Sequence, residues 1–280
     1  MRIVNTVIEL REVIKTWRSK GESVAFVPTM GNLHAGHLHL VNMARKKADR
    51  VVVSIFVNPT QFGAGEDFET YPRTEREDRE KLEAENADLL FQPAVADIYS
   101  PDAKTVVTVT GLSDVYCGAS RPGHFSGVAT VVCKLFNIVQ PDIALFGLKD
   151  FQQLTVIKTM VRDLNIPVEI TGVDTVREAS GLAMSSRNGY LTEDEKKVAP
   201  KLYHSLCAAR NAILAGDQTY ANIEQRALQF LQQAGFQPDY FSVCRSRDLT
   251  KATAEDVDLV LLTAAKLGKT RLIDNIYFSR

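Results

Sequence analysis

The first two-thirds of the chain alternates short apolar runs with stretches in which apolar residues recur every third or fourth position. Short apolar runs are typical of strands buried in a parallel sheet, and the wider spacing is typical of amphipathic helices. The predicted strands are 23–27, 51–57, 88–91 and 143–146, and the predicted helices are 3–17, 36–48, 74–86, 127–139 and 151–161. Valine and threonine alternate over 105–110, which predicts an extended segment. This order favours a Rossmann-like α/β fold with a doubly wound parallel sheet.

The pattern changes after about residue 176. Helical patterns come first and strand-like runs follow, at 193–215 and 219–234, then 240–244, 258–264 and 271–278. Helices grouped before strands are typical of a smaller α+β domain. We therefore predict a Rossmann-like domain over 1–176 and a C-terminal α+β domain over 177–280.

Charge and cysteine content narrow the class of protein. Lysine and arginine total 33 and aspartate and glutamate total 34, so the formal net charge is −1. A broad basic field for nucleic acid would need an excess of basic residues. The four cysteines include no C-x-x-C pair, which argues against a zinc site or a disulfide framework. No apolar run resembles a signal peptide or reaches the roughly 18 residues of a membrane span. We expect a cytoplasmic protein without nucleic-acid or membrane partners.

The first candidate for chemistry is the segment 28–37, Pro-Thr-Met-Gly-Asn-Leu-His-Ala-Gly-His, which leaves the first buried strand and opens a helix. A helix N-terminus at the carboxyl end of a strand is a suitable place for a phosphate group. His34 and His37 can present both imidazoles to one anion and stabilise charge that develops on phosphorus. The alternatives are two structural histidines, or a zinc pair for which no third ligand lies nearby.

A second candidate lies in the segment 181–188, Gly-Leu-Ala-Met-Ser-Ser-Arg-Asn. Two hydroxyl groups and a guanidinium beside a glycine suit a triphosphate, although a polar turn with capping serines is the alternative. The earlier H-x-G-H pattern resembles the signature of adenylate-forming nucleotidyltransferases. Members of that superfamily pair it with a second, mobile motif that contains serine and lysine or arginine, which favours the nucleotide interpretation.

Over essentially its whole length, the sequence resembles the pantothenate synthetase family, also called pantoate–β-alanine ligases. Six segments carry the resemblance: 28–37, 56–62, 71–74, 121–128, 147–154 and 185–188. It implies an AMP-forming ligase of pantothenate biosynthesis, in the coenzyme A pathway. Such an enzyme makes pantoyl adenylate from pantoate and Mg-ATP and releases pyrophosphate. The amine of β-alanine then attacks the adenylate, giving pantothenate and AMP. The resemblance also implies a homodimer.

The resemblance further implies which residues bind ATP. The matching positions are Met30, Gly31, Asn32, Leu33, His34, Ala35, Gly36, His37, Gly147, Leu148, Lys149, Asp150, Val176, Met184, Ser185, Ser186 and Arg187. Among them, His34, His37 and Lys149 are the expected catalytic residues. Asp150 would bind the ribose hydroxyls, although a carboxylate at a helix start is also an ordinary cap. Val176 would lie beside adenine, with simple core packing as its alternative.

Pantoate is expected to be bound by Gln61 and Gln153, with Asn58 in the same pocket. Neutral amides offer donors and acceptors to hydroxyl and carboxylate groups without a cation that would weaken the carboxylate as a nucleophile. Isolated glutamines are more often surface residues, and here it is their flanking sequences that favour binding. In this interpretation the first domain binds nucleotide and pantoate, and the second carries the motif 185–188 and covers the site.

The expected cofactor is Mg²⁺, which arrives with ATP as substrate and prefers oxygen ligands. Asp78 matches an acidic, metal-associated position of the family. It also lies among Glu75, Glu77 and Glu80 on a charged predicted helix, so a solvated helix face is the alternative.

Two neighbouring segments are candidates for a supporting role. Arg121 and His124 precede the predicted helix 127–139 and suit either a phosphate-binding or a structural role. Residues 63–67, Gly-Ala-Gly-Glu-Asp, have the composition of a hinge. We therefore expect residues 63–70 to be mobile when no substrate is bound.

Two other functions compete with the ligase. One is another nucleotidyltransferase of the same superfamily, which transfers a cytidylyl or adenylyl group; the glutamine-bearing motifs and the C-terminal domain argue against it. The other is a non-catalytic nucleotide sensor or RNA-binding module. The near-neutral charge and the intact histidine pair argue against that function, which predicts binding without turnover.

Overall fold

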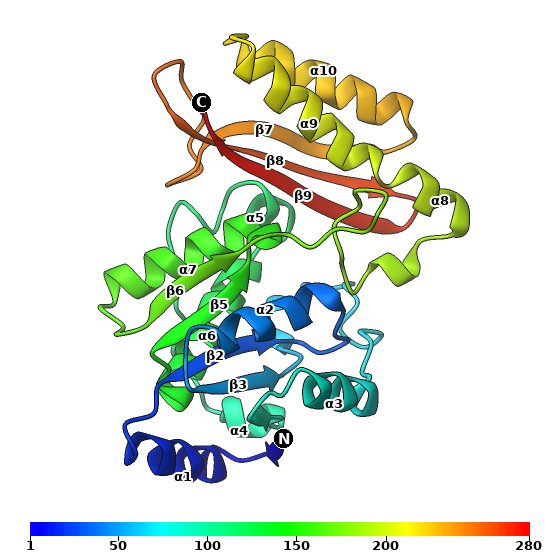
Figure 1. Cartoon of the computed structure of the whole chain (residues 1–280). Coiled ribbons are helices and arrows are strands. Elements are labelled where there is room, and N and C mark those ends of the chain that lie inside the picture. Colours follow the sequence, from blue (N-terminus) through cyan, green and yellow to red (C-terminus); the bar gives the residue numbers. More distant parts are fainter. The chain divides into compact units, whose positions relative to one another are not determined.

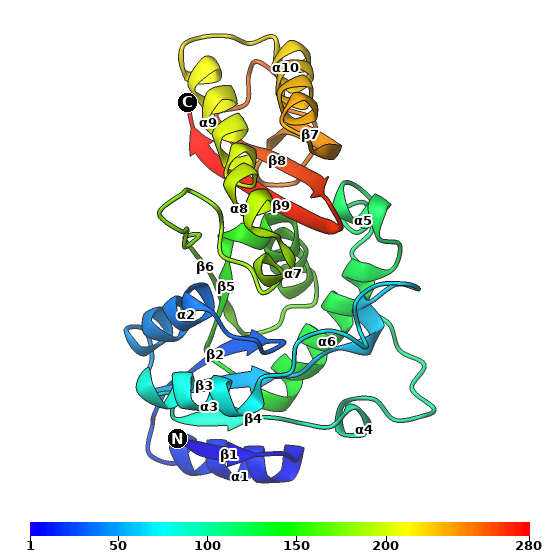
Figure 2. The same cartoon turned by 90° about the vertical axis from the view of Figure 1, so that its right-hand side faces the viewer.

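The computed structural model describes residues 1–280, and packing divides them into two units. Unit 1 comprises residues 1–148 and 156–174, and unit 2 comprises residues 149–155 and 175–280. Figures 1 and 2 show the chain coloured along its sequence. Unit 1 ends close to the domain boundary predicted near residue 176. Packing also assigns 149–155 to unit 2, which the sequence did not suggest, and the domain assignment itself stays a prediction.

Unit 1 is built on a six-stranded parallel sheet with the strand order β1-β4-β3-β2-β5-β6, which confirms the predicted α/β class. Its strands are β1 (Arg2–Val4), β2 (Val24–Thr29), β3 (Arg50–Ile55), β4 (Leu89–Phe91), β5 (Ile143–Gly147) and β6 (Glu169–Val173). The strand order reverses between β2 and β5. Open α/β sheets bind ligands outside the carboxyl ends of their strands at such a reversal, and the candidate motifs 28–37 and 147–154 begin there.

Helices cover both faces of this sheet. The helices of this part of the chain are α1 (Val7–Arg18), α2 (Ala35–Arg45), α3 (Glu75–Ala84), α4 (Val95–Ile98), α5 (Cys117–Ser120), α6 (His124–Val139) and α7 (Phe151–Asp163), with the short 3₁₀ helices η1 (Pro59–Gln61) and η2 (Leu148–Asp150). On one face, Val27 shares a core with Leu40 of α2 and Leu82 of α3. Phe26, which precedes Val27 in β2, points to the other face, where its ring centroid lies 6.5 Å from that of Phe136 in α6. No helix combines the length and apolar character needed to cross a bilayer.

Unit 2 contains a three-stranded antiparallel sheet in the order β7-β8-β9. Its elements are η3 (Asn188–Tyr190), α8 (Glu193–Val198), α9 (Lys201–Leu214), α10 (Tyr220–Gln233), β7 (Gln237–Arg245), β8 (Asp258–Leu267) and β9 (Thr270–Ser279). Helices α9 and α10 lie along one face of the sheet (Figure 1). Leu206 of α9, Leu231 of α10 and Leu261 of β8 are fully buried in one shared core. The smaller α+β fold is confirmed.

Two predicted elements were wrong, and one strand was missed. Ile3 lies in β1 beside Leu90 and not in a helix, because the Thr6 side chain caps α1 and starts it at Val7. The predicted helix 193–215 is two helices, since Pro200 lacks the N–H that a continuous helix needs. Strand β6 was not predicted. Residues 105–110 form no ladder with any strand.

Candidate active site

A buried carboxylate holds the loop between β2 and α2 in an unusual conformation. Gly31 and Asn32 have φ values of +83° and +50°. A Cβ on Gly31 would lie 3.0 Å from Cγ2 of Ile55 and 3.2 Å from Oδ2 of Asp78, so a side chain here would crowd both residues. Asp78 is 1% exposed, and its two carboxylate oxygens accept the N–H groups of Asn32 at 2.8 Å and Leu33 at 2.7 Å. Asp78 therefore fixes the path of this loop.

The predicted histidine pair stacks at the start of α2. The ring centroids of His34 and His37 are 4.0 Å apart, with 30° between the ring planes. Nδ1 of His34 accepts the N–H of Gly36 at 3.1 Å and caps the helix, and Nδ1 of His37 accepts the N–H of His34 at 3.4 Å. Because both Nδ1 atoms accept, the neutral rings carry their protons on Nε2. Imidazole donors beside a helix N-terminus suit an anion, while the cap also gives His34 a structural role.

Asn58, the N-cap of η1, and Gln61, its last residue, are both predicted to bind substrate and form a buried amide pair. Nδ2 of Asn58 donates to Oε1 of Gln61 at 3.0 Å, and Oδ1 of Asn58 accepts from the Tyr99 hydroxyl at 3.0 Å. Nε2 of Gln61 lies 3.2 Å from Sδ of Met30, a predicted nucleotide residue. The structure thus brings the two predicted sets together in unit 1. Tyr99 had no signal in the sequence, because it lies far from the motif that it supports.

Arg121, the C-cap of α5, and His124, the first residue of α6, support the same segment. Nδ1 of His124 donates to the carbonyl oxygen of Gln61 at 2.8 Å, and its Nε2 accepts from Arg121 at 3.0 Å. The Arg121 guanidinium also binds both carboxylate oxygens of Glu66, at 2.7 and 2.6 Å. This hydrogen bonding, opposed in part by burial, lowers the pKa of Glu66 from its ordinary value of 4.5. These hydrogen bonds directly support a structural role for Arg121 and His124. They connect Glu66, in the predicted hinge, to the start of α6.

A second set of predicted residues lies in unit 2. Lys149 is in η2, and its side chain is 18% exposed, with Nζ 3.9 Å from Oδ1 of Asp150. The carbonyl oxygen of Lys149 accepts the side-chain amide of Asn275 at 2.7 Å. Gln153 is half-buried, one residue after the buried Gln152. Asn275 was not predicted, since nothing in its local sequence marks it.

The second nucleotide motif forms the end of a hairpin in unit 2. The N–H of Met184 donates to the carbonyl oxygen of Val176 at 3.0 Å, so these two predicted ATP-binding residues are neighbours. Ser185 Oγ accepts the N–H of Arg187 at 3.2 Å, as expected for a turn with a capping serine. Residues 184–187 are all half-buried. The turn geometry satisfies the structural alternative and leaves the nucleotide role as a prediction.

The predicted site residues are therefore divided between the units. Unit 1 carries residues 30–37, Asn58, Gln61, Asp78, Gly147 and Leu148, and unit 2 carries Lys149, Asp150, Gln153, Val176 and residues 184–187. No group of three or more His, Cys, Asp or Glu side chains is placed to hold a metal ion. The solvated-face interpretation is wrong for Asp78, which is buried, and its metal role stays a prediction.

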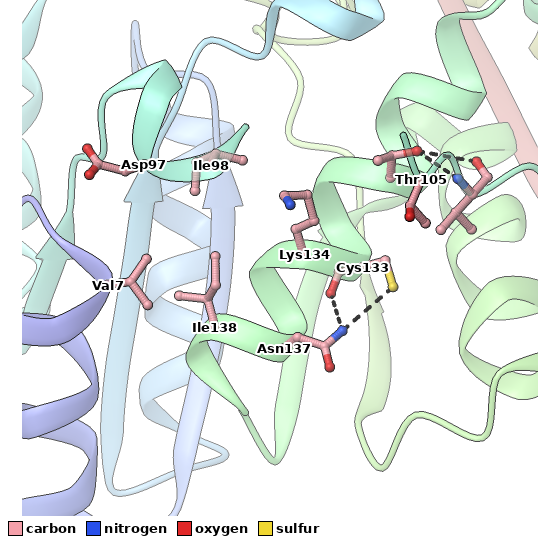
Figure 3. A pocket seen from close by; sticks show the side chains of 10 residues that line it. Val7, Asp97, Ile98, Thr105, Cys133, Lys134, Asn137 and Ile138 are labelled. Carbon is pink, nitrogen blue, oxygen red and sulfur yellow. Dashed lines mark hydrogen bonds between the residues drawn. The ribbon is translucent and has the colours of Figure 1, made fainter. Parts of the chain in front are cut away.

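A cavity of about 370 Å³ lies elsewhere in unit 1, among α1, α4, α6 and the segment 105–107 (Figure 3). Its lining consists of Val7, Asp97, Ile98, Thr105, Val107, Thr130, Cys133, Lys134, Asn137 and Ile138. Oγ1 of Thr130 accepts the N–H of Val107 at 2.9 Å, and Nδ2 of Asn137 donates to the Cys133 carbonyl at 2.8 Å. The Thr130 hydroxyl and the Asn137 amide are thus hydrogen-bonded to backbone groups of the protein. No predicted site residue lines the cavity.

Sequence comparison identifies close relatives. The family described as pantoate-beta-alanine ligase matches residues 2–277. A protein from Methylococcus capsulatus described as pantothenate synthetase is 58% identical over 281 residues, which cover 100% of this chain and 98% of that protein. A Shewanella loihica protein with the same description is 57% identical and covers 100% of both chains.

Structural comparison agrees with the sequence. The crystal structure of pantothenate synthetase from Thermus thermophilus matches with a TM-score of 0.93 at 46% identity, covering 99% of both chains. Pantoate-beta-alanine ligase from Francisella tularensis matches with a TM-score of 0.81 at 34% identity, covering 99% of this chain and 97% of that one. That structure is described as a complex with Beta-gamma ATP and beta-alanine.

Proposed function

The chain belongs to the pantoate-beta-alanine ligase family, and from that premise we propose that it is an enzyme that joins pantoate to β-alanine with the use of ATP. The observation that carries this proposal is the match over residues 2–277, which contains every candidate motif. The stacked histidines at a helix N-terminus and the buried amide pair beside Met30 support it, because they provide anion donors and a neutral polar site.

The first step of the proposed reaction forms an acyl adenylate. An oxygen of the pantoate carboxylate attacks the α-phosphorus of ATP in line, the bond to the oxygen that bridges to the β-phosphate breaks, and pyrophosphate leaves. The Nε2–H groups of His34 and His37 and the ammonium of Lys149 stabilise the charge that develops on the phosphate oxygens. Residues 185–187 add hydroxyl and guanidinium donors. Positioning and electrostatics supply the acceleration without a covalent bond to the enzyme.

The second step consumes the adenylate. The amine of β-alanine attacks the carbonyl carbon, AMP leaves, and the new amide nitrogen loses a proton. Gln61 and Gln153 hold the pantoyl group through its hydroxyl and carbonyl oxygens, and Asn58 keeps the amide of Gln61 oriented. Exclusion of water from the adenylate favours attack by the amine over hydrolysis.

We treat Mg²⁺ as part of the substrate Mg-ATP. Mg²⁺ at a nucleotide is held mainly by phosphate oxygens and water, so this form of binding needs no set of three protein ligands. Asp78 is the one predicted metal-associated residue, and both of its oxygens already accept main-chain N–H groups. Bound with ATP, the ion would neutralise phosphate charge.

The test is ATP–pyrophosphate exchange by the purified protein with Mg²⁺, with and without pantoate and in the absence of β-alanine. Exchange that depends on pantoate supports the adenylate step and fixes the substrate class. Folded protein that binds ATP and shows no exchange contradicts the two-step reaction. Exchange or transfer with another acceptor or nucleotide would favour the other nucleotidyltransferases, and binding without any turnover would favour the sensor.

We also propose that the enzyme is a cytoplasmic homodimer. Its use of ATP and its four free cysteines suit the cytoplasm. The apolar stripe of α6 is used within unit 1, whereas Val106 is 67% exposed in a valine- and threonine-rich segment with no strand partner. Such a segment is suited to pair with a second copy. Light scattering should give twice the chain mass, and Val106→Glu should give a monomer; a monomeric wild type contradicts the proposal.

A further inference from the structure

Strand β9 holds two segments of unit 2 that carry predicted ATP residues. Successive side chains of a strand point to opposite faces, and the contacts of β9 follow this rule. Leu272 and Ile276 pack into the core beneath α9 and α10, so Asp274, between them in the alternation, faces the same side. Asn275 and Tyr277 face the other side, where the Tyr277 ring stacks on Phe151 with 6.0 Å between centroids.

Asn275 is the direct link to Lys149. Its side-chain amide donates to the Lys149 carbonyl oxygen at 2.7 Å, and Asn275 is only 6% exposed. A short, buried hydrogen bond fixes the main chain at Lys149, and the aromatic stack at Phe151 fixes it two residues later. The direction in which the Lys149 side chain leaves the backbone is therefore set by β9, 126 residues away in the sequence.

The strand is itself anchored on its other face. The Arg177 guanidinium donates to both carboxylate oxygens of Asp274, at 2.7 and 2.9 Å, and to the carbonyl oxygen of Gly181 at 3.1 Å. Cζ of the Arg177 guanidinium lies 3.6 Å from the centroid of the Tyr203 ring. Arg177 and Gly181 belong to the hairpin that leads into residues 184–187. The pair of residues Asp274 and Asn275 thus connects that hairpin to the segment at Lys149.

We propose that Asn275 is a positioning residue for Lys149, and that it sets the place of the lysine ammonium through the main chain. The inference rests on the proposed role of Lys149 at the ATP phosphates. Asn275 reaches the carbonyl oxygen of Lys149, so its effect on adenylation passes through that residue. Loss of the amide should lower the rate of adenylate formation without abolishing it, since the lysine stays present and mobile.

The test is a double-mutant cycle of Asn275→Ala with Lys149→Ala, measured by pantoate-dependent ATP–pyrophosphate exchange. Asn275→Ala alone should lower the exchange rate about tenfold, less than the roughly 10²-fold cost of a 1 Å misplacement, because the lysine is retained. In the Lys149→Ala background the same change should cost less than about twofold, because residues that act as a unit are not additive. Asn275→Gln, which keeps the amide donor, should recover part of the lost rate.

Thr263→Val is the matched control. Thr263 is 1% exposed on the neighbouring strand β8, and its hydroxyl donates to the Tyr240 carbonyl at 3.0 Å. Thr263→Val therefore removes one buried hydrogen bond from the same sheet and leaves the contacts of Lys149 unchanged. Thermal unfolding should report a loss of stability for both changes, while only Asn275→Ala lowers exchange. An equal loss in the two backgrounds, or an exchange rate for Asn275→Ala within about twofold of wild type, overturns the proposal.

The same cycle measured as ATP affinity by calorimetry separates this inference from the proposed function. If wild-type protein shows no pantoate-dependent exchange, the proposed function fails. The positioning of Lys149 then stands only if Asn275→Ala weakens ATP binding in the wild type and not in the Lys149→Ala protein. Additive losses of affinity contradict it.

Discussion

The carboxylate of Asp78 accepts the main-chain N–H of Leu33 at 2.7 Å, across 45 residues of sequence. A buried carboxylate is stable only when its charge is satisfied, and here main-chain donors of Asn32 and Leu33 satisfy it. The same bonds hold the loop that leads to the histidine pair. The acidic residue of α3 therefore acts on the candidate site through the backbone.

We predict that Asp78→Asn destabilises the protein by about 1.5–3 kcal/mol, the scale of a hydrogen bond to a charged group. An asparagine offers one acceptor and turns an N–H₂ donor toward the other main-chain N–H. Adenylation should fall as well, because the loop loses its anchor. Urea unfolding and pyrophosphate exchange measure the two effects.

Glu77→Gln provides the control for this change, since Glu77 is an exposed neighbour on the same helix and should leave both measurements unchanged. A magnesium titration separates an anchor from a metal ligand. If Asp78 acts as an anchor, Asp78→Asn should need no more Mg²⁺ for half-maximal exchange. A higher Mg²⁺ requirement without loss of stability would support the metal role instead.

We predict that His37→Ala or Lys149→Ala lowers adenylate formation by at least about 10²-fold, the scale of losing one donor to a developing oxyanion. The measurement is the pantoate-dependent exchange rate at saturating ATP. His39→Ala is the control, because His39 lies on the same helix outside the stacked pair. A rate like that of wild type would remove the substituted residue from the mechanism.

We predict that Gly31→Ala costs more stability than Gly21→Ala. Both glycines have positive φ, +83° and +76°, so each substitution carries about 1–2 kcal/mol of backbone strain. Only at Gly31 does the new Cβ also meet Ile55 and Asp78, at 3.0 and 3.2 Å, whereas Gly21 has open space. Urea unfolding of the two variants isolates the crowding. Equal losses of unfolding free energy in the two variants would show that the loop adjusts to the new Cβ without a further cost.

We predict that the Glu66–Arg121 contact depends on pH in the acid range. The hydrogen bond from Arg121 lowers the pKa of Glu66 below its ordinary value of 4.5 in the folded state. The contact therefore contributes stability above the unfolded pKa and loses it as pH falls through the lowered folded pKa. Hydrogen exchange of residues 63–70, corrected for intrinsic rates, should show protection at neutral pH that is lost only as the pH falls below the ordinary glutamate pKa of 4.5.

The control for this titration is Glu66→Gln, which keeps the shape of the side chain and removes its charge. Its loop should exchange faster at neutral pH and show no transition in the acid range. Protection of core amides in β2 should not change over the same interval, which excludes global unfolding. A wild-type loop that exchanges equally fast at all pH values would contradict the contact and favour a mobile hinge.

Local patterns in the sequence predicted much of the fold. Most strands of the parallel sheet, its covering helices and the C-terminal strands follow from apolar spacing, which is a local property. The errors have local and tertiary causes. The break at Pro200 and the cap at Thr6 were visible in the sequence, whereas β1 is a strand only because β4 offers it a partner.

The sequence by itself determined the family and the fold class and indicated the candidate motifs, because motif spacing and hydrophobic periodicity are properties of the sequence itself. Only the tertiary structure decided what holds those segments in place. Asp78 accepts the main-chain N–H of Leu33, the Tyr99 hydroxyl donates to Asn58, and the Asn275 amide donates to the carbonyl oxygen of Lys149. Each contact joins distant residues whose meeting depends on sheet register and on the need to satisfy buried polar groups, and neither can be read from local sequence.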